Sequence, residues 1–123
     1  MSTSNVEKMR DDVYRQYEVE EGSVEENLYA LFAKDAVIQQ GDGPEFSRQD
    51  LARMAAAVRQ TPKSERIVEM TDFGEDGDTI TFNMHVRFRN PETGELEETY
   101  SENFARFNGQ GKVVESRSKP KAE

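Results

Sequence analysis

Hydrophobic and polar residues alternate through the second half of the chain, in four runs that short turn sequences separate. An alternation with a period of two is typical of β-strands, because successive side chains point to opposite faces of the sheet. Between the runs stand Gly, Asn, Asp and Pro, which favour reversal of the backbone. The pattern predicts four consecutive antiparallel strands, over about Lys63–Phe73, Asp78–Arg89, Glu95–Phe107 and Lys112–Ser118.

The first 60 residues show a different pattern, in which apolar residues recur every three or four positions. This spacing places the apolar side chains on one face of a helix. A first helix is predicted over about Val6–Val19, with an apolar stripe formed by Val6, Met9, Val13 and Tyr17. One short apolar run, Ala36–Gln39, interrupts the helical part and is predicted to be a short strand.

Capping residues mark the start of two further helices. Ser23 is an N-cap candidate, and Glu26 follows at the spacing of a capping box. Ser47 and Asp50 repeat this arrangement, and Pro62 marks the end of the third helix. Helices followed by a long antiparallel meander predict an α+β domain, with the helices packed on one face of the sheet.

The third predicted strand carries bulky apolar residues on both faces. Leu96, Tyr100 and Phe104 share one face, while Ala105 and Phe107 share the other. An antiparallel sheet needs only one buried face in a monomer. The second apolar face therefore predicts packing against another molecule, most simply a second copy of the chain. A β-bulge that switches faces within the strand is the alternative.

Composition narrows the classes of function. The 123 residues carry a net charge of −9, which argues against a basic surface for nucleic acid or anionic lipid. The chain has no cysteine and one histidine, His85, which excludes disulfides, cysteine nucleophiles and a multi-histidine metal site within one chain. We expect a single domain over 1–123 with disordered ends at 1–5 and 119–123, no membrane segment, no cofactor and a cytoplasmic location.

Two segments resemble the nuclear transport factor 2-like superfamily, which includes ketosteroid isomerases and SnoaL-like polyketide cyclases. They are Leu31-Phe32-Ala33-Lys34-Asp35-Ala36-Val37-Ile38 and the hairpin from Asn103-Phe104-Ala105-Arg106-Phe107 to Gly111-Lys112-Val113. The resemblance implies helices packed on a strongly curved antiparallel sheet, which forms a cone-shaped half-barrel with a cavity. It also implies a homodimer through the outer sheet face and a small hydrophobic ligand.

The resemblance also assigns site residues. The catalytic base of the isomerases corresponds to Gln40, which cannot act as a base near neutral pH, and the acid of their oxyanion hole corresponds to Asn103. An amide donates a hydrogen bond but has no proton affinity to tune. Tyr14 or Tyr17 on the first helix could supply the tyrosine of the oxyanion hole. We therefore expect Tyr14, Tyr17, Gln40 and Asn103 to bind a ligand.

Three carboxylates are candidates for acid–base catalysis. If Val113 points into the cavity, as the resemblance implies, Glu115 and Arg117 point the same way along the strand. Glu115 could then act as a base beside a ligand-binding Arg117, or could simply pair with it. Asp42 follows the usual base position by two residues and becomes the base only if its loop folds inward.

Asp72 is the third candidate, and a solvated charge on a strand is its alternative interpretation. His85 is the obvious acid–base group by type, but its alternation places it on the outer face. The sequence thus predicts a small-molecule-binding cavity protein, with cofactor-independent acid–base catalysis on a hydrophobic substrate as one interpretation. The alternative is a non-catalytic dimeric ligand-binding or interaction module of the same fold.

Overall fold

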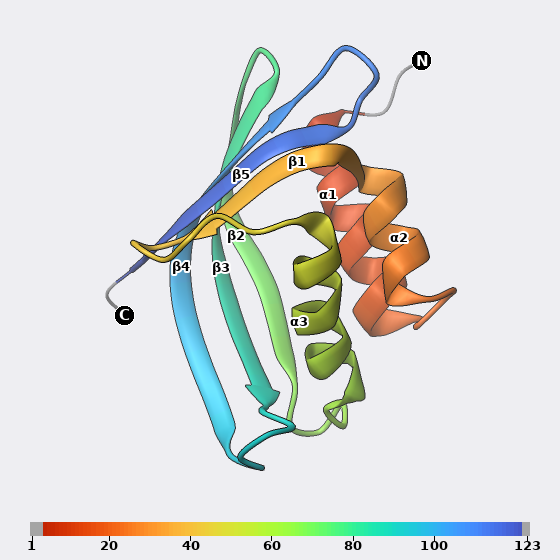
Figure 1. Ribbon diagram of the computed structural model, residues 1–123, viewed down its shortest axis with the longest axis vertical. Coiled ribbons are helices and arrows are strands. Elements are labelled where there is room, and N and C mark those ends of the chain that lie inside the picture. Colours follow the sequence, from red (N-terminus) through yellow and green to blue (C-terminus); the bar gives the residue numbers. More distant parts are fainter. Residues whose placement is uncertain (1–3, 122–123) are drawn as a thin grey trace.

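The computed structural model describes residues 4–121, in which helices pack on one face of a curved five-stranded sheet (Figure 1). The strand order is β1-β5-β4-β3-β2. The strands are β1 (Phe32–Gln40), β2 (Ile67–Asp76), β3 (Thr79–Arg89), β4 (Leu96–Phe107) and β5 (Val113–Pro120). β2 to β5 form the predicted antiparallel meander, and β1 adds to it parallel to β5. The α+β class is confirmed, with a mixed rather than purely antiparallel sheet.

The helices are α1 (Asn5–Val13), the π-helical turn η1 (Tyr14–Glu18), α2 (Val24–Leu31) and α3 (Arg48–Gln60). α1 runs directly into η1, so together they occupy the segment predicted as the first helix. Ser23 caps α2 by accepting a hydrogen bond from the Glu26 backbone N–H. Ser47 and Asp50 form the reciprocal capping box predicted for α3.

Two arginine side chains tie η1 to the rest of the fold. Arg66, whose side chain is only 4% exposed, donates to the backbone carbonyls of Tyr17 and Arg59. Arg59 in turn donates to the carbonyls of Gln16 and Gly22. Carbonyls at a helix end have no partner within the helix. The two arginines therefore supply hydrogen-bond donors to the carbonyls at the end of η1 and link η1 to α3.

The pairing of β3 with β4 shows which side chains share the sheet face that meets the helices. Ile80 pairs with Ala105, and both are completely buried, while Phe82 pairs with Asn103. The register runs without a shift from one end of β3 to the other. β4 therefore has two apolar faces, as predicted, and the alternative of a mid-strand bulge is wrong. Tyr100 lies on the outer face.

A bulge in β5 reverses one prediction. Val113 is fully buried and pairs with Phe107, but the next pair joins Glu115 to Arg106, so Val114 is an extra residue. Such a bulge moves the following side chains to the opposite face. The expectation that Glu115 points inward with Val113 is therefore wrong, and Arg117 also lies on the outer face.

The described ends belong to regular structure where we expected disorder. Asn5 is the first residue of α1, with Ser4 as its N-cap, and Lys119 and Pro120 belong to β5. The remaining parts of the expected disordered ends, 1–3 and 122–123, lie outside the described residues. Within 4–121, no helix has the length and apolar character needed to cross a membrane.

Candidate functional site

An inner cavity of about 150 Å³ lies between the helices and the inner sheet face. All three helices, η1 and all five strands contribute to its wall. Much of this wall is apolar, and it includes Met9, Leu28, Leu51, Met70, Phe82 and Met84. Because the curved sheet wraps around the helices (Figure 1), side chains far apart in the sequence meet around this space.

A row of neutral polar side chains borders the cavity on the sheet side. Ser118 pairs with Gln40 on one side and with Asn103 on the other, so the three residues share the inner face. Gln40 and Asn103 thus border one cavity, and their contact with a ligand stays a prediction. Gln40 is exposed, which places this end of the row toward solvent. We call Gln40, Ser118 and Asn103 the polar row.

A buried acid and a buried amide border the cavity on the helix side. Asp12 is 7% exposed and Gln16 is 1% exposed. The Gln16 Nε2 donates to Asp12 Oδ2 over 2.9 Å. Within residues 4–121, Asp12 Oδ1 and Gln16 Oε1 have no hydrogen-bond partner. Because buried polar atoms are nearly always paired, these two exceptions mark the Asp12–Gln16 pair as a candidate site.

Burial changes the proton affinity of two groups at the cavity. It raises the pKa of Asp12 to about 6, although the hydrogen bond from Gln16 and the charge of Arg15 oppose the rise. Burial also raises the pKa of Tyr17, and the charge of Asp12 adds to this effect. Asp12 therefore titrates near the range in which a general acid or base is useful, while Tyr17 stays a protonated donor.

The sequence carries a signal for this pair in the spacing of α1 and η1. Asp12 and Gln16 follow Met9 by three and seven residues, so they belong to the same helical face. The predicted stripe used Val13 and Tyr17 instead, both of which are less buried than Asp12 and Gln16. Two polar residues at the centre of a buried helix face indicate a site, because such positions are normally apolar.

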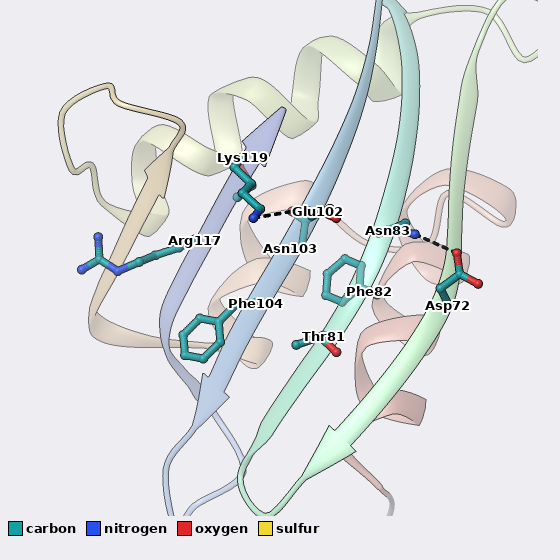
Figure 2. A pocket seen from close by; sticks show the side chains of 10 residues that line it. Asp72, Thr81, Phe82, Asn83, Glu102, Asn103, Phe104, Arg117 and Lys119 are labelled. Carbon is teal, nitrogen blue, oxygen red and sulfur yellow. Dashed lines mark hydrogen bonds and ion pairs between the residues drawn. The ribbon is translucent and has the colours of Figure 1, made fainter. Parts of the chain in front are cut away.

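A second hollow, of about 470 Å³, lies on the outer face of the sheet (Figure 2). Asn83 Nδ2 donates to Asp72 Oδ2 over 2.7 Å on one side, and Lys119 pairs with Glu102 over 3.2 Å on the other. Phe104 lies between Thr81 of β3 and Arg117 of β5, with which it pairs across the strands. We call this hollow the outer groove.

No protein-family model matches the sequence, and no curated protein matches it either. Solved structures do match. An uncharacterised cystatin-fold protein from Novosphingobium aromaticivorans is 15% identical, with a TM-score of 0.72 over 95% of this chain and 98% of that one. A candidate SnoaL-like polyketide cyclase from Jannaschia sp. CCS1 is 11% identical, with a TM-score of 0.70 over 96% and 89%.

An NTF2-like protein of unknown function from Burkholderia pseudomallei is 15% identical, with a TM-score of 0.69 over 98% of this chain and 92% of that one. The chain has the nuclear transport factor 2-like fold. The resemblance seen in the sequence is thus confirmed for the fold. Identities this low show the fold alone, because one fold hosts many unrelated functions.

Not all of the predicted ligand-binding residues lie at the inner cavity. Gln40, Asn103 and Tyr17 border the inner cavity. Tyr14 is 59% exposed and is not among the residues that line it. Arg117 borders the outer groove instead of the inner cavity. Three of the five predicted ligand-binding residues are therefore brought together, and the β5 bulge separates Arg117 from them.

The three predicted catalytic carboxylates all lie away from the inner cavity. Glu115 is on the outer face, 2.6 Å from Arg117 and 3.3 Å from Arg106, and these hydrogen bonds lower its pKa. Asp72 borders the outer groove, and Asp42 lies in an exposed turn after β1. The same line of argument, a carboxylate whose proton affinity rises in an apolar cavity, applies to Asp12 instead.

His85 lies on the outer face, as its alternation predicted. Its ring stacks on Tyr100 with 4.1 Å between ring centres, and its Nε2 lies 2.5 Å from Glu98 Oε2. The hydrogen bond to His85 is the main reason why the pKa of Glu98 is lowered. His85 therefore belongs to an outer-face cluster and is separated from the inner cavity by the sheet.

Proposed function

We propose that the inner cavity binds a small molecule and that Asp12 carries a proton in cofactor-independent acid–base chemistry. One observation supports this above all: Asp12 is a buried carboxyl group in a largely apolar cavity, and one of its oxygens has no partner within residues 4–121. Similarity to a candidate polyketide cyclase is compatible with such chemistry, but only at the level of the fold.

The cavity residues suggest a division of roles. As a carboxylate, Asp12 removes a proton from a carbon next to a carbonyl group, and the C–H electron pair passes into the ligand as an enolate. The Tyr17 hydroxyl, kept protonated by its raised pKa, would donate to the enolate oxygen. The polar row would orient the remainder of the ligand. Return of the proton from Asp12 to the ligand closes the cycle without a cofactor.

The volume limits what can bind. A cavity of about 150 Å³ is below the range of roughly 300–1,000 Å³ that is usual for drug-sized ligands. An engineered cavity of about this size in another protein holds benzene. We therefore expect a ligand, or the part of a ligand that reaches Asp12, to be about the size of one six-membered ring.

Proton exchange with solvent tests the proposal. The α-protons of cyclohexanone in D₂O provide a one-ring probe, and NMR follows their replacement by deuterium. We expect the chain to accelerate exchange and Asp12→Asn to lower that rate by about 10²–10⁴-fold, because an amide cannot accept the proton. Asp11→Asn, at the exposed neighbouring position, is the matched control and should exchange as the wild type does. Equal exchange by the Asp12 variant contradicts the catalytic role.

A non-catalytic ligand-binding module is the second candidate. It is favoured by the polar row, where Gln40 and Asn103 supply hydrogen bonds but no ionisable group. In that case native mass spectrometry finds a co-purified ligand, while the cyclohexanone exchange rate stays at the level of the buffer. For either function we expect a homodimer through the outer sheet face and retain the cytoplasm as the expected location.

A further inference from the structure

We propose that the inner cavity selects a neutral molecule of about one ring that carries a hydroxyl group, and that this hydroxyl donates to the Asp12–Gln16 pair. This inference rests on the proposed ligand-binding function of the cavity. It concerns the chemistry of the ligand, and it can fail while the cavity still binds and exchanges protons.

The hydrogen-bonding state of the pair requires a donor. Both oxygens that lack a partner within residues 4–121, Asp12 Oδ1 and Gln16 Oε1, are acceptors. The Gln16 amide nitrogen already donates to the other carboxyl oxygen. A buried acceptor without a donor is costly, and the cost is recovered when a ligand donates to it. A ligand hydroxyl is a compact neutral group that can do so.

The charges around the pair argue for a neutral ligand. Asp12 repels anions when it is ionised, and the net charge of −9 adds to that repulsion. Cations are repelled by the arginines of the protein. The charge of Arg15 interacts with Asp12, and the charges of Arg59 and Arg66 interact with Tyr17. Positive charge near this end of the cavity is therefore supplied by the protein itself.

The rest of the wall matches a ring. Met9, Met70 and Met84 lie around the space, and thioethers make favourable contacts with aromatic rings. The Asp12–Gln16 pair comes from the helices, whereas the polar row comes from β1, β4 and β5. A ring placed between them would direct its hydroxyl to the helix side.

Four probes of similar size separate the alternatives: phenol, toluene, benzylamine and benzoate. Binding at pH 7 is measured by calorimetry or by NMR titration. We expect phenol to bind at least about tenfold more tightly than toluene, because only phenol donates to the buried acceptors. Benzylamine and benzoate should bind more weakly than phenol.

Variants connect the preference to the pair. Gln16→Met removes one acceptor at similar volume, and Asp12→Ala removes the other, so each should reduce the preference for phenol over toluene to about threefold or less. Asp11→Asn should retain the wild-type preference. The Gln16 variant keeps the test valid if the Asp12 variant fails to fold.

Toluene binding as tightly as phenol would overturn the hydroxyl inference and leave the cavity proposal intact. Tighter binding of benzylamine or benzoate than of phenol would overturn the inference that the ligand is neutral. If none of the four binds and cyclohexanone exchange is also absent, both the inference and the proposed function are wrong.

Discussion

At the scale of single residues, Asp12 is placed where ionisation opposes folding. Its pKa rises from an ordinary value of 3.8 to about 6 on burial. A carboxyl group whose folded pKa is raised binds its proton more tightly in the folded state. The contribution of this bound proton to the free energy of unfolding is complete below about pH 4 and is lost as the pH rises through 6. The shift corresponds to about 3 kcal/mol.

This predicts a pH-dependent difference between the wild type and Asp12→Asn. Between pH 4 and pH 7, the wild type should lose about 2 kcal/mol of unfolding free energy relative to the variant, because Asn cannot ionise. Urea unfolding at the two pH values measures this difference, and the comparison cancels the titration of other groups.

The exposed neighbour provides the control for that experiment. Asp11→Asn should follow the wild-type pH profile, since Asp11 is exposed. Parallel profiles for the wild type and Asp12→Asn would show that Asp12 has an ordinary proton affinity in the folded chain, and would remove the electrostatic argument for its role.

At the scale of elements, η1 depends on a contact from outside its own segment. The Arg66 guanidinium is buried against the Tyr17 carbonyl and lies 5.9 Å from the centre of the Tyr17 ring. π-Helical turns are rare and occur often at functional sites. Since Gln16 and Tyr17 both come from η1, the arginine supports residues that line the cavity.

Replacement of Arg66 by Met should therefore destabilise the fold by about 2–4 kcal/mol, because buried carbonyls lose their charged donor while the apolar stem is kept. Urea unfolding at neutral pH measures the loss. Arg53→Met on α3 is the control, because Arg53 is 73% exposed and should change stability by less than about 0.5 kcal/mol. Equal stability of the two variants would contradict the supporting role of Arg66.

At the scale of the whole molecule, the outer sheet face is the expected dimer interface. Tyr100 and Phe104 lie on it, and the ring of His85 stacks on Tyr100. An outer face with large side chains and a groove of about 470 Å³ fits packing against a second copy. The oligomeric state itself stays a prediction.

Phe104→Lys should shift the chain toward monomer, because it would bury an unpaired charge at such an interface. Sedimentation velocity at micromolar concentration measures the shift. Met54→Lys is the control, since Met54 is 40% exposed on α3, on the helical side of the sheet. A monomeric wild type would refute the dimer.

Local patterns in the sequence determined the elements and much of their order. Alternation predicted β2 to β5, and the capping residues Ser23 and Ser47 correctly marked the starts of α2 and α3. These signals suffice because periodicity and capping involve residues only a few positions apart. The same alternation placed His85 on the outer face, and the resemblance placed Gln40 and Asn103 at one cavity.

The tertiary structure alone decided the site. The extra residue at Val114 sent Glu115 outward, and no pattern within β5 announces a bulge, because it is defined by pairing with β4. Likewise, the sequence shows Asp12 as a polar residue on a helix, but its proton affinity depends on the strands and helices that bury it. Periodicity is a local property of the chain, whereas register and desolvation arise only when distant segments meet.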